Sequence, residues 1–509
     1  MAQTEKPRLT EEQQKAVDIL DRNVAVSAGA GSGKTQVLTR RFVHTLESGL
    51  EDAGKRISTH QILAITFTEK AAAEMRERIR QLLKERVQNA GSPEESGFWR
   101  ERLQELPQTQ IGTIHSLCSS ILRMNPLESG VDPAFRILTS PDLERFLAES
   151  SRDFLRTELA GTRKDPDYRP ELLTAEYGAA RLTDLLAGEF ADGDLPGETE
   201  WEDGLSGAQG REKELFLAWK RLLEHFHAYM VQQKRDLHVL TFNDLEREAV
   251  RLLEGREALC RRYARKYRYI MVDEFQDTNH WQKSLIYLLA GGRADKLEGN
   301  RLFVVGDAKQ SIYRFRGADV SVFAKVQKDI VAPEDPGKKP QPAEKRLQGE
   351  RISLAVNFRS GAPVLRFCNT FFREVFGQAD DAGADFIPFE EQLLPAARDG
   401  AGKESFLPKA PQFFWVKGNV KPAVAQQCEA GLVARELKRL HGEEQVPYED
   451  MAILLRKMTN SGMLAETLRD AGVPVKVVDG RNFYDRQDVR DLMNLFFFVA
   501  DPHAEGPLL

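Results

Sequence analysis

The sequence predicts an α/β fold in which a parallel sheet is covered by helices on both faces. Near-continuous apolar runs, each followed by a polar or glycine-rich loop, indicate buried strands at 23–28, 62–67, 110–114, 269–273 and 302–306. Helical segments separate these runs, as parallel pairing requires, because parallel neighbours need a long crossover. In such sheets the functional residues gather at the carboxyl ends of the strands.

A glycine-rich loop follows the first apolar run. The segment Ser27–Thr35 reads SAGAGSGKT and precedes a periodic helical stretch at 37–43. Its glycines let backbone N–H groups turn onto phosphates, and the helix N-terminus adds partial positive charge. Lys34 is placed to reach the β/γ-phosphates and Thr35 to bind Mg²⁺. A flexible glycine/serine loop is the alternative, which the lysine–threonine ending and the flanking elements disfavour.

The loop departs from the usual pattern at one position, because Ala28 stands where that pattern has glycine. The residues expected to contact ATP are Ala28, Gly29, Ala30, Gly31, Ser32, Gly33, Lys34 and Thr35.

Two adjacent acids end the strand predicted at 269–273. In the segment 272–278, which reads VDEFQDT, Asp273 is expected to hold Mg²⁺ and Glu274 to polarise the attacking water. A solvated acidic turn is the alternative. The glycine-rich loop favours the ATPase interpretation, because the two segments would meet at one edge of the sheet.

Composition sets further limits. The 509 residues allow three to four domains, and the net charge of −6 offers no broad basic surface for nucleic acid, so any such binding needs a local groove. Four scattered cysteines support neither a disulfide framework nor a zinc site. The first residues lack a signal peptide's apolar core, and the longest apolar run, 495–500, is too short to span a membrane. We therefore expect a cytoplasmic protein with no membrane partner.

Further along the chain, a second set of apolar runs predicts a second α/β domain. Its strands are expected at 352–356, 412–416, 451–455 and 473–478. A proline- and lysine-rich stretch at 333–342 cannot pack a core and is expected to be a loop or a linker between the two domains.

The region between about 120 and 240 has a helical pattern. One face of a long amphipathic helix carries Leu215, Trp219, Leu222, Leu223, Phe226 and Met230. We take this region as a helical insertion. The expected domains are 1–120 and 239–330 for the first α/β domain, 121–238 for the insertion, 331–350 for the linker or loop and 351–509 for the second α/β domain.

The acidic segment 273–278 resembles motif II of the UvrD/Rep-like superfamily 1A DNA helicases. The other motifs stand in that family's order: motif Q at 9–17, I at 27–35, Ia at 66–75, Ib at 113–118, III at 305–318 and IV at 354–360. The resemblance implies a RecA-like P-loop NTPase sheet, a helical insertion and part of a second RecA-like domain. It also implies ATP and Mg²⁺ as cofactors and single-stranded or tailed duplex DNA as the partner.

The resemblance adds residues to the nucleotide site. Gln13 is expected to pair with the adenine edge, and Gln276 and Gln310 to sense the γ-phosphate and relay its presence. Arg359 resembles an arginine finger, with a structural ion pair as the alternative. Phe358 stands where the family often has tyrosine, and its ring is expected to stack on adenine.

The resemblance also implies a strand-binding groove. Phe67, Tyr313 and Phe315 are expected to stack on bases without sequence preference. Ordinary core aromatics are the alternative for all three, above all for Phe67 at its strand end. The residues expected to hold phosphates and sugars are Thr68, Thr113, His115, Ser116 and Arg316.

Within the family, 239–246 and the run from 450 to 489 resemble the AddA/RecB-like helicases that process double-strand breaks. The resemblance ends before motifs V and VI, and no nuclease carboxylate cluster is visible. We therefore expect the ATP-binding N-terminal half of an ATP-dependent DNA helicase or translocase of repair and recombination. Either the sequence is a natural or engineered truncation, or a helicase/nuclease partner subunit supplies the rest. The alternative is a non-catalytic or partner-dependent DNA-binding protein derived from such a helicase.

Overall fold

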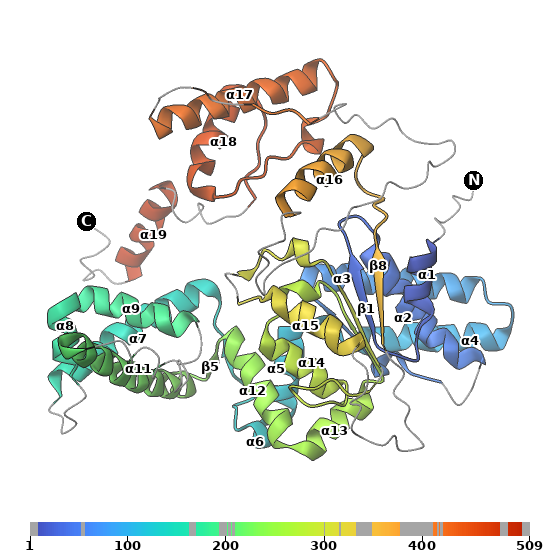
Figure 1. Ribbon diagram of the computed structural model, residues 1–509, viewed down its shortest axis with the longest axis horizontal. Coiled ribbons are helices and arrows are strands. Elements are labelled where there is room, and N and C mark those ends of the chain that lie inside the picture. Colours follow the sequence, from blue (N-terminus) through green and yellow to red (C-terminus); the bar gives the residue numbers. More distant parts are fainter. Residues whose placement is uncertain are drawn as a thin grey trace. The chain divides into compact units, whose positions relative to one another are not determined.

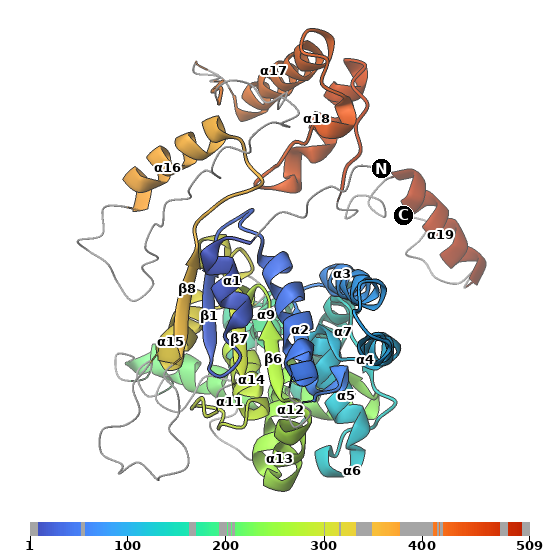
Figure 2. The ribbon, with the colours of Figure 1, turned by 90° about the vertical axis from the view of Figure 1, so that its right-hand side faces the viewer.

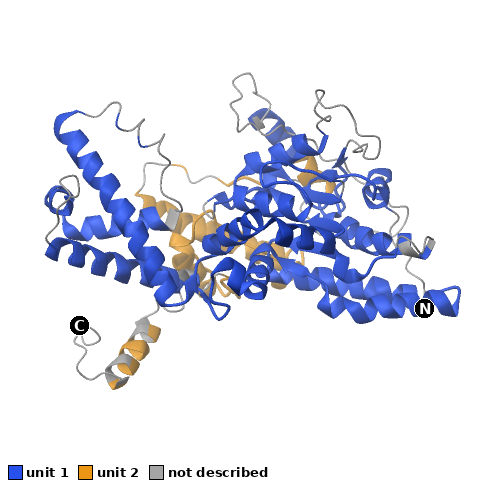
Figure 3. Cartoon of the chain, turned by 90° about the horizontal axis from the view of Figure 1, so that it is seen from below, with its two compact units in different colours: residues 1–360, 368–395 blue, residues 361–367, 396–509 orange. Residues whose placement is uncertain are grey.

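The computed structural model describes residues 9–51, 56–161, 169–192, 201, 205, 209–299, 301–314, 317–331, 349–376, 411–414, 417, 421–478 and 487–500 (Figure 1). The chain divides into two compact units. One comprises Met1–Ser360 with Cys368–Pro395, and the other Gly361–Phe367 with Ala396–Leu509 (Figure 3).

The first unit is built on a six-stranded parallel sheet. Its strand order is β3-β2-β6-β7-β1-β8, with β3 at Ile111–Thr113, β2 at Ile62–Thr66, β6 at Tyr269–Val272, β7 at Leu302–Gly306, β1 at Val24–Ala28 and β8 at Glu350–Leu354. The first five of these are the strands expected from the apolar runs, and that prediction is confirmed.

Helices cover both faces of the sheet because alternate strand residues point to opposite sides. Leu63 and Ile65 lie in one core cluster, whereas Ile62 and Ala64 lie in the other. One side is covered by α1 (Glu11–Asp18), α2 (Lys34–Glu51), α3 (Glu69–Gln88) and α4 (Pro93–Glu105) (Figure 2). The other is covered by α5 (Ile114–Met124), α12 (Phe242–Gly255), α13 (Glu257–Lys266), α14 (His280–Leu289) and α15 (Val320–Val331).

Strand β8 differs from the sequence expectation. The run at 352–356 was assigned to the second domain, yet Glu350–Leu354 pairs in parallel with β1. Ile352 and Leu354 are buried in the core cluster shared with α1 and α2. Apolar alternation indicates a strand but does not say which sheet it joins. The pairing carries the segment 355–360 to the carboxyl end of β1.

The helical insertion has a core of its own, in agreement with the amphipathic pattern. It contains α7 (Ser140–Ala160), α8 (Pro170–Tyr177), α9 (Ala179–Asp192) and α11 (Gly210–Asp236). Leu222, Phe226 and Met230 of α11 are buried in this core, and Leu215 and Trp219 pack against it. The core runs in sequence from Leu138 to Val239, whereas Ile121 and Leu122 of α5 belong to the sheet's core.

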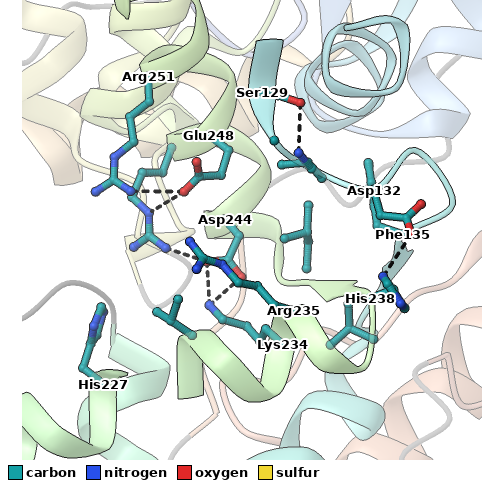
Figure 4. A pocket seen from close by; sticks show the side chains of 16 residues that line it. Ser129, Asp132, Phe135, His227, Lys234, Arg235, His238, Asp244, Glu248 and Arg251 are labelled. Carbon is teal, nitrogen blue, oxygen red and sulfur yellow. Dashed lines mark hydrogen bonds and ion pairs between the residues drawn. The ribbon is translucent and has the colours of Figure 1, made fainter. Parts of the chain in front are cut away.

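A short ladder and a buried ion pair join the insertion to the sheet domain. Strand β4 (Arg136–Ile137), which follows α6 (Pro126–Ser129), pairs with β5 (Val239–Leu240), which follows α11. Lys234 Nζ lies 2.7 and 2.8 Å from the two carboxylate oxygens of Asp244 on α12, and Arg247 Nη2 lies 2.7 Å from one of them. These groups border a cavity of about 420 Å³ (Figure 4). The two cationic side chains on this wall of the cavity are thus paired with the Asp244 carboxylate.

The second unit contains helices around a small core. Helix α16 (Ala362–Phe376) lies partly in each unit, and the second unit also holds α17 (Pro422–Gly442), α18 (Ser461–Asp470) and α19 (Gln487–Ala500). Ala434, Leu468 and Val473 form its buried centre. No helix in the part of the chain that the structure describes is long and apolar enough to cross a membrane.

The strands predicted at 451–455 and 473–478 are wrong for this structure, since these residues form no strand in either sheet. An extended segment becomes a strand only where a neighbour takes its backbone hydrogen bonds. No such neighbour occurs among the described residues of the second unit, where Leu454 is 94% and Val478 80% exposed. The run at 412–416 lies partly outside the described residues, as do most of the expected linker 331–350 and the 501–509 end.

Candidate functional site

The loop between β1 and α2 has the geometry of a phosphate cradle. Gly31 has φ +72° and Gly33 has φ +85°, a left-handed backbone that favours glycine. A Cβ on Gly31 would lie 2.6 Å from the Cβ of Arg359, and one on Gly33 would lie 2.9 Å from Gln13 Nε2. A side chain at either position would therefore displace its neighbours. Helix α2 begins at Lys34, so its N-terminus faces the loop.

The acidic pair meets this loop at the carboxyl edge of the sheet. Lys34 Nζ lies 2.7 Å from Glu274 Oε2, although the two residues are 240 positions apart. Glu274 has φ +50°, an unusual conformation for a residue with a side chain, and its N–H donates to Asp273 Oδ1 at 3.0 Å. The motif I lysine and the motif II carboxylates are thus neighbours, as the sequence predicted.

Asp273 is suited to a divalent cation. Burial and the adjacent Glu274 carboxylate raise its pKa to about 7, while Lys34 opposes the shift. A carboxylate that is costly to ionise alone gains most from a bound cation. Thr35 is the second residue of α2. These two oxygen donors fit the hard-ligand preference of Mg²⁺.

Gln276 links Glu274 to the loop after β7, and Gln310 lies within that loop. Gln276, in the short helix η4 (Phe275–Asp277), donates from Nε2 to Glu274 Oε2 at 2.9 Å and accepts from the Asp307 N–H at 3.0 Å. Gln310, in η5 (Ala308–Gln310), donates to Asp307 Oδ2 at 2.8 Å. Motifs II and III are therefore hydrogen-bonded to each other, which is the arrangement that a relay from the γ-phosphate requires.

Gln13 lies beneath the loop and is nearly fully buried. Its Oε1 accepts from the Thr10 N–H at 3.0 Å, and its Nε2 donates to the Ser32 carbonyl at 2.8 Å. The capping box of α1 thereby fixes Gln13 against the cradle. This position is compatible with support of the loop, and pairing with adenine stays a prediction.

The segment after β8 docks on the same loop through a residue that sequence reasoning missed. Asn357 is buried, and its Nδ2 donates to the Ala30 carbonyl at 2.7 Å. The Phe358 N–H donates to the Gly31 carbonyl at 2.9 Å, which leaves the ring 42% exposed. Arg359 is exposed beside Gly31. The asparagine of motif IV was visible in the sequence, but its partner could not be known before β8 was placed.

Two of the expected base-stacking residues, Phe67 after β2 and Tyr313 in the loop after β7, lie together beyond the carboxyl ends of these strands. The Phe67 and Tyr313 rings contact each other, with centroids 4.6 Å apart and planes inclined by 31°. That separation leaves no room for a base between them, because inserting one would require about twice the 3.4 Å stacking distance. Bases would meet an outer ring face. Phe315 and Arg316 lie outside the described residues.

The expected phosphate-contacting hydroxyls also cap helices. Thr68 is exposed and accepts from the Ala71 N–H at the start of α3. Thr113 Oγ1 accepts from the Ser116 N–H at 3.2 Å and donates to Glu69 Oε1 at 2.8 Å. Ser116 Oγ donates to the Thr113 carbonyl. The structure thus gathers Thr68, Thr113 and Ser116 at the ends of β2 and β3, and contact with DNA stays a prediction for each.

A family model described as the UvrD/REP helicase N-terminal domain matches residues 9–331. The chain belongs to the UvrD/REP helicase family. A second model, the UvrD-like helicase C-terminal domain, matches 352–506. This UvrD-like chain therefore carries sequence of both family domains, and the expectation that it lacks motifs V and VI is not supported by the comparison.

Relatives of this UvrD-like chain are named as DNA-processing enzymes. The ATP-dependent DNA helicase UvrD1 of Mycobacterium tuberculosis is 32% identical over 97% of the chain and 52% of that protein. The ATP-dependent DNA helicase PcrA of Staphylococcus aureus is 27% identical over 97% of the chain and 54% of that protein. An ATP-dependent helicase/nuclease subunit of Ligilactobacillus salivarius is 25% identical over 99% of the chain and 51% of that protein. The chain spans about half the length of these relatives.

Proposed function

We propose that the chain is part of an ATP-dependent DNA helicase or translocase that acts on single-stranded DNA with ATP and Mg²⁺. One observation carries the proposal: Lys34 of the phosphate cradle and the Asp273–Glu274 pair meet at one sheet edge, with Lys34 Nζ 2.7 Å from Glu274 Oε2. A cation, two carboxylates and a glycine cradle are the groups that phosphoryl transfer to water needs.

Each of these groups has a defined task. The backbone of 29–33 and Lys34 would bind the β/γ-phosphates, and Thr35 and Asp273 would hold Mg²⁺, which neutralises charge on the transferred group. Glu274 would orient and deprotonate the water, once Lys34 turns from this carboxylate to the nucleotide. Gln276, Gln310 and Arg359 would sense or stabilise the γ-phosphoryl group, as the resemblance implies.

The described residues of the expected strand-binding set, from Phe67 to Ser116 and Tyr313, end or follow strands β2, β3 and β7 of the same sheet. Phe67, Tyr313 and Phe315 would stack on bases, and Thr68, Thr113, His115, Ser116 and Arg316 would hold the backbone. Because the net charge is −6, stacking rather than long-range attraction should supply much of the affinity.

ATP hydrolysis with and without an unstructured oligonucleotide tests the proposal. Wild-type protein should hydrolyse ATP faster when the oligonucleotide is added. Lys34→Ala should abolish both rates, whereas Lys84→Ala, an exposed lysine of α3, should change neither. Equal hydrolysis by wild type and Lys34→Ala would overturn the site assignment.

We further propose an AddA/RecB-like role in double-strand-break processing, in the cytoplasm and with a helicase/nuclease partner subunit. The likeness of 239–246 to that branch and the named L. salivarius relative support this. Unwinding of a blunt-ended duplex, measured with and without the partner, is the test. Unwinding only of 3′- or 5′-tailed duplexes, with no effect of a partner, would contradict it.

A partner-dependent or non-catalytic DNA-binding protein is the second candidate. It is favoured by the exposed apolar residues of the unpaired segments 451–455 and 473–478. Strand displacement by the purified chain alone separates the two candidates: robust ATP-dependent unwinding supports the self-sufficient helicase, and its absence the partner-dependent one.

A further inference from the structure

A buried carboxylate outside motifs Q to IV, at the end of the 239–246 run, lies between the two halves of the site. Glu246, on α12, is 2% exposed. Its Oε1 lies 2.9 Å from His115 Nε2 and 2.6 Å from Gln282 Nε2, and its Oε2 lies 2.7 Å from Asn279 Nδ2. A buried carboxylate is tolerated when several donors satisfy it, and here the donors come from α5 and α14.

Glu246 determines how the His115 ring is held. A carboxylate only accepts hydrogen bonds, so Nε2 of His115 must carry a proton, and Nδ1 is left for an outside partner. Phe242, on the same helix, packs against the ring at a centroid distance of 4.7 Å. The imidazole, which is 33% exposed, is thus oriented by two residues of α12.

The second oxygen of Glu246, Oε2, accepts from Asn279, which lies five residues after Glu274 of motif II. Asn279 is the N-cap of α14, where its Oδ1 accepts from the Gln282 N–H at 2.9 Å. Between Glu274 and Asn279 stands only the short helix η4 with Thr278, whose hydroxyl donates to the Phe275 carbonyl. A shift of η4 would therefore move Asn279, and with it the donor that holds Glu246.

We infer that Glu246 is a positioning residue that links the nucleotide-dependent loop at Glu274 to His115 in the strand-binding groove. The inference rests on the proposed function, because it takes His115 to contact DNA. One carboxylate provides this link, because it lies 2.6 to 2.9 Å from His115 on one side and from Asn279 and Gln282 on the other.

Glu246→Gln tests the link because an amide has a single acceptor oxygen and cannot accept from all three donors. We expect wild-type His115 to show the Nε2-protonated pattern in ring ¹⁵N spectra and Glu246→Gln to lose it. Affinity for a fluorescent oligo-dT should fall about tenfold. ATP–Mg²⁺ binding should stay unchanged. Glu248→Gln, the same substitution two residues along α12, should change none of these.

Two further variants make the result specific. In a His115→Ala background, Glu246→Gln should cause no additional loss of oligo-dT affinity. Asn279→Ser keeps a good N-cap but removes the amide donor. It should reduce the change in oligo-dT affinity that a non-hydrolysable ATP analogue produces in the wild type.

The outcomes separate the inference from the function. Wild-type protein that does not bind oligo-dT overturns the proposed function and with it the inference. If the wild type binds oligo-dT, either of two results overturns the inference alone. One is an unaltered His115 spectrum in Glu246→Gln, and the other is a loss of affinity on Glu246→Gln that is the same with and without His115. An unaltered response to the ATP analogue in Asn279→Ser overturns the link to motif II.

Discussion

Asn357 Nδ2 donates to the Ala30 carbonyl at 2.7 Å, across 327 positions of sequence. The same side chain accepts from the N–H groups of Arg359 and Ser360 through Oδ1. One buried amide thus fixes the motif IV segment on the phosphate cradle and shapes the turn that carries Arg359.

Removal of this amide should weaken nucleotide binding without unfolding the protein. Asn357→Ala leaves the partly buried Ala30 carbonyl without its side-chain donor, which costs about 1–1.5 kcal/mol. We expect about a tenfold loss of affinity for a fluorescent ATP analogue, measured by titration. Asn243→Ala, an exposed asparagine of α12, is the control. Unchanged affinity would show that the cradle keeps its shape without Asn357.

Glu274→Gln should separate binding from hydrolysis. The amide keeps the shape of the side chain but cannot take a proton from water, and a general base contributes about 10²–10⁴-fold. We expect ATP–Mg²⁺ to bind at least as tightly as to wild type, because Lys34 loses its competing carboxylate partner. Steady-state hydrolysis and analogue titration together check this. Hydrolysis within a few-fold of wild type would exclude Glu274 as the base.

Cation binding should depend on pH through Asp273. Its pKa is raised to about 7, so below that pH a proton competes with Mg²⁺ for the carboxylate. We expect Mg²⁺-dependent analogue binding to weaken as pH falls from 8 to 6. Asp273→Asn should bind Mg²⁺–nucleotide poorly and show no such dependence. A wild-type affinity that is flat across this range would contradict the assignment.

The same shift predicts a stability effect in the nucleotide-free protein. The unfolded carboxyl titrates near 3.8 and the folded one near 7, so the folded state holds the extra proton between these values. This contribution to stability is complete below about pH 4 and is lost as pH rises through 7. Urea unfolding at pH 5.5 and 8 should show a smaller pH effect for Asp273→Asn than for wild type.

The ion pair between Lys234 and Asp244 should hold the insertion to the sheet domain. Asp244→Asn removes the carboxylate that Lys234 and Arg247 share, and breaking a buried pair costs about 3–5 kcal/mol. Urea unfolding of the variant should show this loss. The control is Arg235→Ala, at an exposed position next to Lys234 on α11. Its free energy of unfolding should stay within about 0.5 kcal/mol of wild type. A loss below 1 kcal/mol for Asp244→Asn would mean that the pair is dispensable.

Phe67→Ala should weaken binding of single-stranded DNA. A stacked base is worth about 1–3 kcal/mol, and Phe67 also supports the Tyr313 ring at 4.6 Å. Fluorescence titration with oligo-dT measures the loss, and Phe371→Ala, an exposed ring of α16, is the control. Equal affinity of wild type and Phe67→Ala for oligo-dT would show that Phe67 is a core aromatic and does not stack on a base.

Local chemistry let the sequence predict much of this protein. The glycines at 31 and 33, Lys34 and the acids at 273 and 274 indicate a phosphate cradle and its cation site, because only those residue types in that order serve both backbone geometry and charge. The five apolar runs of the first sheet were predicted for the same reason, since a strand buried on both faces must be apolar throughout.

Only the tertiary structure decided which distant segments meet. Glu350–Leu354 pairs with β1, which brings Asn357 to Ala30, whereas 451–455 and 473–478 have equally strand-like sequences and stay unpaired among the described residues. Backbone pairing depends on a neighbour's position, which a segment's own residues do not encode. Glu246 was missed for a related reason: its function comes from three donors on α5 and α14, and a lone glutamate in a helix looks like any other until the fold surrounds it.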